Sequence, residues 1–413
     1  MDDLSSLKQR LSWKKISTSE LKTHDKEGDL WISISGKVYD VSKWLDKHPG
    51  GELPLLNLAG QDVTDAFVAY HLGSAWKYLD QFMIGIHEDY KVSEVSKDYR
   101  KLLGELKKAG LFKGPLLVYF LIGLWMMAML ALCVVGVLFY EGFWLHAGCG
   151  VLLGAVWIQS GWIGHDSAHC GLVGHKKIDR IIQLVAGNCM SGISIGWWKR
   201  NHNAHHISCN SMDFDPDLQC VPLFAVSSGY FASLYSKFYE RKMNFGGLAR
   251  FFVSYQHWSF YPVMAVVRVN LFGQSIALLL SKKRVPSKGM ELACIVVFWI
   301  WFPFLVSCLP TWAERTGFVL SSFAVTGIQH VQFCLNHFSS HVYIGKYCSN
   351  TWFQSQASGT VEATCLKQGQ WFRKTLQVQK MQFYLWGCVW FWGWLQDKSL
   401  LVPESLTQLL CYY

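Results

Sequence analysis

The chain has 413 residues, of which 51% are hydrophobic and 15% aromatic, and its formal net charge is +9. This composition is too apolar for an ordinary soluble enzyme and predicts that part of the chain lies in lipid. The positive charge comes without a long basic run, so it indicates contact with an anionic membrane surface and gives no support to nucleic-acid binding.

Residues 8–90 are predicted to form a soluble α+β module. The N-terminus is polar and lacks the apolar core of a signal peptide, so we expect this module on the cytosolic side. Residues 31–41 alternate in polarity as two strands around a Gly36-Lys37 turn, and short helical patterns follow. Residues 91–114 are charged and partly amphipathic, which predicts a linker or an interfacial helix.

Two pairs of apolar segments follow within residues 115–380. The first pair covers 115–140 and 143–164, and the second covers 293–309 and 316–333. At about 1.5 Å per residue, the first segment is longer than the roughly 30 Å hydrocarbon core of a bilayer. We therefore predict an all-α polytopic membrane domain with about four spans in two hairpins.

The segment 259–280 is ambiguous because it is apolar but contains Arg268. It ends in the basic residues 281–284, which would lie on the lumenal side if the segment crossed the membrane. That placement contradicts the positive-inside bias, so we interpret the segment as interfacial. The polar regions 165–258 and beyond about 337 then share the cytosolic side with the N-terminal module.

Two histidines in the N-terminal module have the pattern of a heme site. His48 lies in an H-P-G-G motif, and His71 follows 23 positions later, after a helical stretch. Two neutral imidazoles on opposing turns can occupy both axial positions of a heme iron, which suits electron transfer rather than oxygen binding. Either histidine alone is more often a structural residue, but the motif makes the pair specific.

Five further histidines follow the first hairpin, in two clusters at helical spacing: His165, His169, His202, His205 and His206. Residues at i, i+3 and i+4 share a helix face, so these imidazoles can point at one centre just outside the bilayer. The alternative is a set of solvated interfacial histidines. Sites made only of imidazole suit zinc, copper or iron, and a neighbouring one-electron carrier favours iron that activates dioxygen.

A third cluster ends the last apolar segment, at residues 329–337. We choose His337 as a sixth metal ligand. His330 lies about two helical turns deeper and is interpreted as a polar packing residue.

The N-terminal module resembles cytochrome b5. The resemblance rests on residues 38–41, Trp44, 48–51, 62–67 and His71. It implies heme b with His48 and His71 as the axial ligands.

The histidine boxes behind such a module resemble the front-end desaturases, which are membrane di-iron enzymes. Residues 201–206, 213–217 and 252–258 look closest to plant sphingolipid Δ8 long-chain-base desaturases. The resemblance implies that dioxygen and electrons from the fused heme domain are used to insert a Δ8 double bond into a long-chain base or ceramide. It also implies two iron ions, an NADH-dependent cytochrome b5 reductase as partner, and the endoplasmic reticulum membrane.

The chain departs from that family in its third histidine box, which should read Q-x-x-H-H. The lead-in survives as Trp371-Phe372 and residues 376–379, but the two histidine positions hold Gln382 and Phe383. Their loss would leave the second iron site incomplete. The tail, residues 381–413, is atypical as well.

Three alternatives therefore stay open beside a Δ8 desaturase. The chain could be a catalytically inactive relative that acts only as a heme electron carrier. It could also be a Δ6-type fatty-acid desaturase or a hydroxylase that uses the same metal chemistry.

Overall fold

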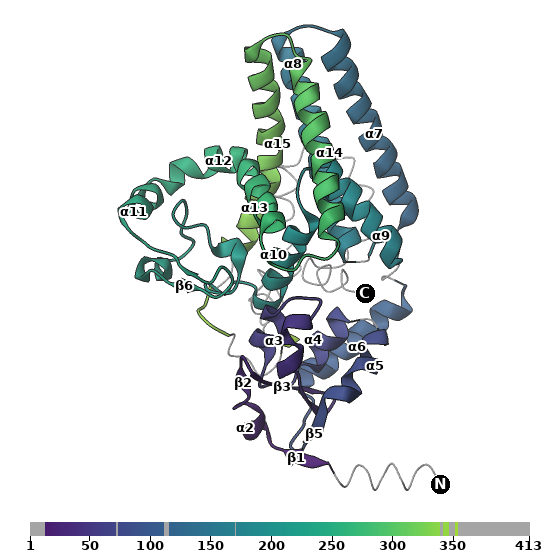
Figure 1. Ribbon diagram of the computed structural model, residues 1–413, viewed down its shortest axis with the longest axis vertical. Helices are drawn as coiled ribbons and strands as arrows, with labels where there is room; N and C mark the ends of the chain where they lie inside the picture. Colours follow the sequence, from purple (N-terminus) through teal and green to yellow (C-terminus); the bar gives the residue numbers. More distant parts are fainter. Residues whose placement is uncertain are drawn as a thin grey trace.

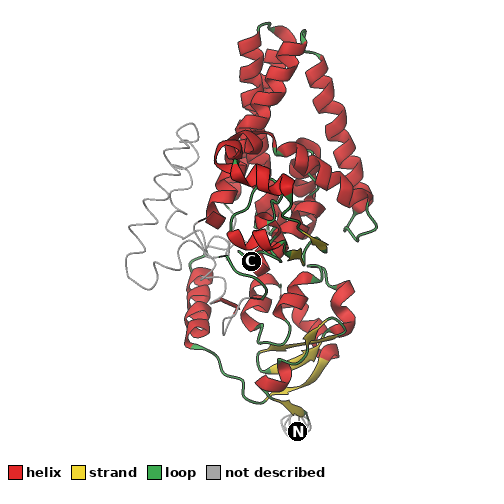
Figure 2. Cartoon of the chain, turned by 90° about the vertical axis from the view of Figure 1, so that its left-hand side faces the viewer, coloured by secondary structure: helices red, strands yellow, loops and turns green. Residues whose placement is uncertain are grey.

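The computed structural model describes residues 13–71, 73–110, 115–169, 171–338, 342–346 and 352–353. The N-terminal module lies at one end of the molecule, and the long helices extend from the opposite end (Figure 1). The strands of the module lie at its far side, away from those helices (Figure 2). The predicted sites at Gln382 and Phe383 fall outside the described residues.

The module contains a five-stranded sheet in the order β1-β5-β4-β3-β2. The strands are β1 (Lys14–Ile16), β2 (Asp25–Lys26), β3 (Asp29–Ile34), β4 (Lys37–Asp40) and β5 (Met83–His87). β1 pairs parallel to β5, and the other neighbours are antiparallel. Ser35 and Gly36 join β3 to β4 and both have positive φ, so the turn lies one residue earlier than the predicted Gly36-Lys37 pair.

Short helices cover the sheet and complete the core of the module. They are α2 (Thr18–Leu21), η1 (Ser42–Lys47), α3 (Leu53–Leu58), α4 (Thr64–Tyr70), η2 (Gly73–Ala75), α5 (Trp76–Leu79) and η3 (Asp80–Phe82). Leu30 and Ile32 of β3 pack against Val63 and Phe67 at the start of α4. This packing fixes where η1 and α4 end, and His48 and His71 follow directly after these two helices.

The segment after the module forms α6 (Glu94–Lys108), which lies against α4 rather than standing apart. The Ser93 side chain caps it by accepting a hydrogen bond from the Ser96 amide. Tyr99 is buried, and the Arg100 guanidinium lies 2.6 Å from the Asp65 carboxylate of α4. These contacts attach much of the predicted linker, residues 91–114, to the N-terminal module.

Four long helices run side by side in the second part of the molecule (Figure 1). They are α7 (Leu116–Phe139), α8 (Phe143–Ala168), α14 (Lys288–Ser307) and α15 (Trp312–Phe338). Of the described helices, α7, α8 and α14 are individually long and apolar enough to cross a membrane. α15 packs along α8, and its residues 316–333 stay a predicted span.

Two shorter helices, α12 (Gln256–Val266) and α13 (Arg268–Leu280), also pass the length and hydropathy test when they are taken together. They are bent by 60° at the break between them, so they form either a broken span or a re-entrant segment. The Arg268 guanidinium at the break donates to the Ser191 carbonyl and lies 4.1 Å from the Trp157 ring centroid. These contacts partly compensate a buried charge. The interfacial placement of 259–280 stays a prediction.

The core of the helical part is dominated by aromatic side chains. Trp157 of α8, Phe298 of α14 and Phe318 of α15 are almost fully buried in it. A Cβ atom added to Gly154 would lie 2.7 Å from the Ser322 carbonyl oxygen, so glycine lets α8 and α15 approach closely.

The remaining elements lie between the long helices and the N-terminal module or beside α12. They are α9 (Lys176–Gln183), η4 (Leu184–Met190), α10 (Ile195–Ser208), η5 (Pro216–Leu218), η6 (Ser228–Ala232), β6 (Tyr235–Ser236), β7 (Arg241–Lys242) and α11 (Gly247–Ser254). α10 is the element that faces α3 and α4 of the module (Figure 1).

Candidate metal centre and heme pocket

The structure brings His48 and His71 together at the ends of η1 and α4 in the N-terminal module. Their ring centroids are 5.9 Å apart with an interplanar angle of 45°. Nδ1 of His48 lies 2.7 Å from the Gly51 carbonyl oxygen, and Nδ1 of His71 lies 3.1 Å from the Phe67 carbonyl oxygen. Donation from Nδ1 leaves Nε2 of each ring as the nitrogen that can bind a metal.

The surroundings of these two rings fit a heme. Burial lowers the pKa of His48, and burial together with the proximity of His48 lowers the pKa of His71 to about 4, so both rings are neutral. Phe67 stacks on His71 at 4.4 Å. A Cβ atom at position 50 would lie 2.9 Å from the His48 ring, so Gly50 leaves the space that this ring needs.

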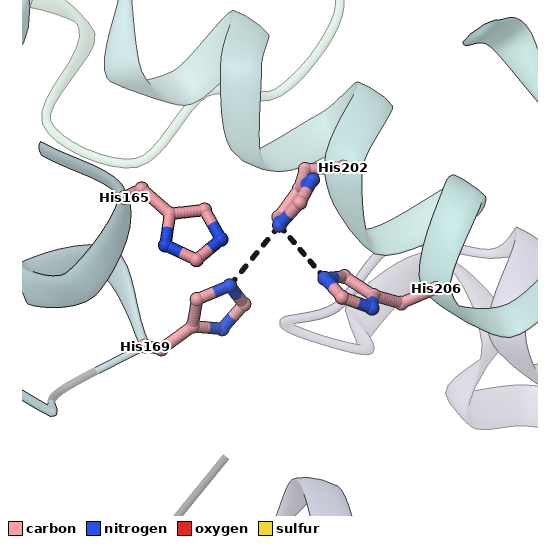
Figure 3. A group of neighbouring side chains, drawn as sticks. All are labelled: His165, His169, His202 and His206. Atoms are coloured by element: carbon pink, nitrogen blue, oxygen red, sulfur yellow. Dashed lines mark hydrogen bonds between the residues drawn. The ribbon is translucent and has the colours of Figure 1, made fainter. Parts of the chain in front are cut away.

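Four histidines from two helices form one cluster, which we call the four-histidine group (Figure 3). His165 and His169 come from the end of α8, and His202 and His206 come from α10. Nε2 of His202 lies 3.1 Å from Nε2 of His169 and 2.7 Å from Nε2 of His206. These nitrogens converge as ligands of one metal ion do.

Polar neighbours orient His165, one ring of the four-histidine group. Nδ1 of His165 lies 2.8 Å from an Asp166 carboxylate oxygen, and the Tyr119 hydroxyl of α7 donates to the other oxygen at 2.6 Å. A carboxylate behind a metal-binding imidazole fixes its tautomer and its orientation. Burial, followed by the proximity of the other histidines, lowers the pKa of His202 and His206 well below the usual range. These two rings are therefore neutral and suited to binding a cation.

A second cluster lies beside the first and has a different donor set, so we call it the mixed group. It contains His205 of α10, Cys209 directly after that helix, Asp215 of the following loop, and His337 of α15. One ligand atom from each of the four lies within 4.8 Å of the others. Two imidazoles, a thiol and a carboxylate can bind a transition metal.

The histidines of the mixed group are also held from behind. Nδ1 of His205 lies 3.0 Å from Oδ2 of Asp215, and Nδ1 of His337 lies 2.8 Å from the Asn210 side-chain oxygen. Burial disfavours a charge on His205, but the Asp215 carboxylate outweighs it and raises the pKa of His205 to about 9. Metal binding at His205 must therefore displace a proton.

The structure divides the histidines that we expected at one centre. His205 lies in the mixed group, whereas His202 and His206 lie in the four-histidine group. The reason is helix geometry: His202 and His206 differ by about 40° around the axis, whereas His205 is turned about 100° from His206. His330 belongs to neither of the two groups found among the described residues, and its interpretation as a packing residue stays a prediction.

A buried carboxylate sets the position of α10. Glu291 of α14 accepts hydrogen bonds from the Ser194 hydroxyl at 2.5 Å and the Gly196 amide at 3.0 Å, and lies 2.7 Å from Arg180 of α9. A negative charge at a helix N-terminus complements the helix dipole. The helix that carries three of the metal-site histidines is therefore anchored to α9 and α14.

Four residues of the two sites were not assigned a role from the sequence: Asp166, Cys209, Asn210 and Asp215. The only feature of the sequence that could have pointed to them is their position: Asp166 lies inside the first histidine cluster, and the other three follow the second. Spacing alone does not say which acidic or amide side chain turns back toward an imidazole.

A small apolar cavity adjoins the mixed group. Phe224, Phe260 and Met264 line it, and His337 and Asp217 border it. Its lining is apolar, but its volume is only about 10 Å³, the space of one water molecule, so it holds no hydrocarbon chain in this conformation.

Comparison with known families and proteins supports both halves of this description. Residues 17–88 match the cytochrome b5-like heme/steroid binding domain, and residues 141–376 match the fatty acid desaturase family. The second match covers more than half of the chain.

Individual relatives match along most of the chain. The acyl-lipid (9-3)-desaturase of Borago officinalis is 54% identical over 367 residues, which are 89% of this chain and 82% of that protein. The Delta(8)-fatty-acid desaturase 2 of Arabidopsis thaliana is 55% identical over 369 residues, 88% of this chain and 81% of that protein. Among solved structures, cytochrome b5 of Ostreococcus tauri virus 2 is 35% identical over 17% of this chain and 94% of its own, with a TM-score of 0.17.

These matches confirm the predicted fold class, an α+β cytochrome b5-like module followed by a helical membrane domain. Among the described helices three could span a membrane, or four if the bent α12–α13 pair is one span. The chain is therefore a multi-pass membrane protein that belongs to the fatty acid desaturase family, with a cytochrome b5-like domain fused at its N-terminal side.

Proposed function

We propose that this desaturase introduces a Δ8 double bond into the long-chain base of a sphingolipid, either free or in ceramide. The observation that carries the proposal is the pair of histidine-containing groups on α8, α10 and α15, next to a cytochrome b5-like domain. The Δ8 position is supported by relatives such as the Arabidopsis thaliana protein named above and the Delta(8)-fatty-acid desaturase of Helianthus annuus, which is 52% identical over 369 residues.

The residues present fit the two cofactors that such a reaction needs. His48 and His71 would hold heme b through Nε2. The four-histidine group and the mixed group would each hold one iron ion, with Asp166, Asn210 and Asp215 orienting the imidazoles. When bound, the iron ions would activate dioxygen for the removal of two hydrogens from the lipid chain, with electrons supplied through the heme.

The chain's own residues would also place the substrate. The apolar cavity at Phe224, Phe260 and Met264 adjoins His337 of the mixed group. The cavity must widen before a hydrocarbon chain can enter it, and a chain in the widened cavity would lie beside the metal site and exclude water from it. This arrangement suits a substrate whose reacting carbons carry no polar group.

The partners follow from the same proposal. An NADH-dependent cytochrome b5 reductase would reduce the heme, and dioxygen would be the second substrate. We place the enzyme in the endoplasmic reticulum membrane with the heme-binding domain in the cytosol, because that side holds the donors of reducing equivalents that the reaction requires.

A specific observation favours a second candidate, an inactive relative that only carries electrons. Gln382 and Phe383 stand where the family's third box has histidines. The mixed group offsets part of this loss, because Cys209 adds a donor to its two histidines and Asp215 holds His205 in place. A Δ6-type fatty-acid desaturase is the alternative on substrate.

Analysis of the products distinguishes these three proposed functions. The protein is expressed in yeast microsomes, and long-chain bases and fatty acids are analysed by mass spectrometry with double-bond localisation. We expect a new Δ8 long-chain base. A new Δ6 fatty acid would shift the substrate assignment, and no new double bond despite full heme loading would favour the electron carrier. The His202→Ala variant, with an intact heme domain, is the matched negative control.

A further inference from the structure

The heme-binding domain is docked directly on α10, the helix that carries three of the metal-site histidines. The side-chain amide of Asn57 in α3 donates to the Ser208 hydroxyl of α10 at 2.9 Å, and both side chains are buried. The Tyr70 hydroxyl at the end of α4 donates to the His206 carbonyl oxygen at 3.3 Å. Two helices of one domain thus contact one helix of the other.

Further contacts hold the same arrangement from the C-terminal side. Lys346 lies 3.2 Å from the Asp25 carboxylate of β2. Gly345 is tied to the loop after α10, because its amide donates to Asp213 at 2.8 Å. Trp352 packs among α4 and α6, where its ring meets that of Tyr70 at a centroid distance of 5.5 Å. Residues after α15 therefore bridge the two domains.

The buried pair argues for one preferred docked position. Separating the domains would expose Asn57 and Ser208 and break their hydrogen bond, and a small shift in register would leave two buried polar groups unpaired. Domains joined by a linker otherwise move relative to one another by default. The contacts with α10 favour one orientation of the heme-binding domain over the others that a linker would allow.

The docked position also gives a short connection between the two sites. Tyr70 precedes His71, a candidate heme ligand, by one residue. Its hydroxyl contacts the main chain of His206, whose imidazole belongs to the four-histidine group. One peptide bond, the Tyr70 side chain and one hydrogen bond therefore connect the two candidate ligands.

We propose that Tyr70 is a positioning residue that holds the heme-binding domain on α10 and completes the path by which electrons pass from one site to the other. The inference rests on the proposed function for its redox part. In each transfer the ferrous heme loses one electron and becomes ferric, and a ferric ion at the four-histidine group becomes ferrous. No proton or other reactant is consumed.

The docked position is tested first, with neither metal nor substrate. The full-length double variant Asn57→Cys with Ser208→Cys is treated in membranes with a short thiol-to-thiol crosslinker, and the joined peptides are identified by mass spectrometry. We expect a crosslink between positions 57 and 208. The single variant Asn57→Cys is the control, because it reveals any reaction with the neighbouring native Cys209. Absence of a crosslink overturns the proposal.

The role of Tyr70 is tested in the same background. Tyr70→Phe removes only the hydroxyl, and we expect it to slow crosslinking by about fivefold, the factor that an ordinary hydrogen bond is worth. Tyr78→Phe, at an exposed tyrosine of the same domain, should leave the rate unchanged. Equal rates in the two variants overturn the role of Tyr70.

The electron path is tested by anaerobic stopped-flow spectroscopy of iron-loaded protein with reduced heme. Tyr70→Phe should slow heme oxidation by at least the same factor of about five, with an unchanged Soret band. Oxidation at the wild-type rate removes Tyr70 from the path. If the wild-type heme itself is not oxidised, the redox part fails together with the proposed function, while the crosslinking result still decides the docking.

Discussion

Nδ1 of His205 lies 3.0 Å from Oδ2 of Asp215, so the carboxylate determines that Nε2 of this histidine faces the metal position. The same carboxylate accepts a hydrogen bond from the main-chain N–H of Asn210 at 2.9 Å, and Asp215 is fully buried. Asp215 therefore fixes His205 from behind the ring.

Replacing that carboxylate should weaken metal binding without unfolding the domain. For Asp215→Asn we expect the iron affinity to fall by about 10-fold to 100-fold, the usual cost of losing a partner of a ligating histidine. Iron retained against a series of chelator concentrations measures this. Glu240→Gln, which changes an exposed carboxylate of the same domain, is the control and should match the wild type. Equal iron retention by both variants would contradict the role of Asp215.

The heme pocket predicts a separate, spectroscopic result. His48→Ala or His71→Ala should abolish the Soret band, because a low-spin six-coordinate heme needs both imidazoles. Membrane insertion should be unaffected, since both residues lie in the N-terminal module, at the ends of η1 and α4. His24→Ala, at a histidine of the same domain that pairs with Asp29, should retain the band. An unchanged spectrum in either pocket variant would exclude that residue as a ligand.

The altered third box can be tested by restoring it. If Gln382 and Phe383 occupy ligand positions, the double variant Gln382→His with Phe383→His should raise the iron content toward two ions per chain and increase product formation. A control that adds the same number of histidines nearby, Gln368→His with Gln370→His, should change neither. Iron content and activity equal to the wild type would mean that these positions do not serve the metal site.

The apolar cavity makes a prediction about the substrate chain. Met264 is buried and lines the cavity, so Met264→Trp should fill it, keep it from widening around a lipid chain and lower activity by about tenfold or more, because small displacements of a reacting chain are costly. Heme and iron content should stay at the wild-type level. Met290→Trp, at an exposed position on α14, is the matched control. Full activity of the Met264 variant would mean that the hydrocarbon chain of the substrate binds elsewhere.

Much of the architecture could be predicted from the sequence because it depends on local patterns. The apolar segments 115–140 and 143–164 correspond closely to α7 and α8, since length and hydropathy alone determine such helices. His48 and His71 could be paired because the motif between them is specific. The prediction of six metal ligands gathered residues that the structure places in two adjacent groups.

The division into two groups could not be predicted, because it depends on where each imidazole points and on loops that return to it. His205 is separated from its neighbours by rotation around α10, and its partner Asp215 reaches it through the loop after that helix. The docking of the heme-binding domain on α10 could not be predicted from the sequence either. Asn57 and Tyr70 resemble ordinary helix residues until α10 is placed against them.

The most direct test of the central claim follows the hydrogens that the reaction removes. Microsomes containing the protein are given NADH and a saturated long-chain base that carries deuterium at C8 and C9, and the products are analysed by mass spectrometry. The account predicts a Δ8-unsaturated base that has lost deuterium from both carbons, and no such product with His71→Ala. A deuterated base recovered unchanged from microsomes with heme-loaded wild-type protein, or an equal yield from His71→Ala, would contradict it.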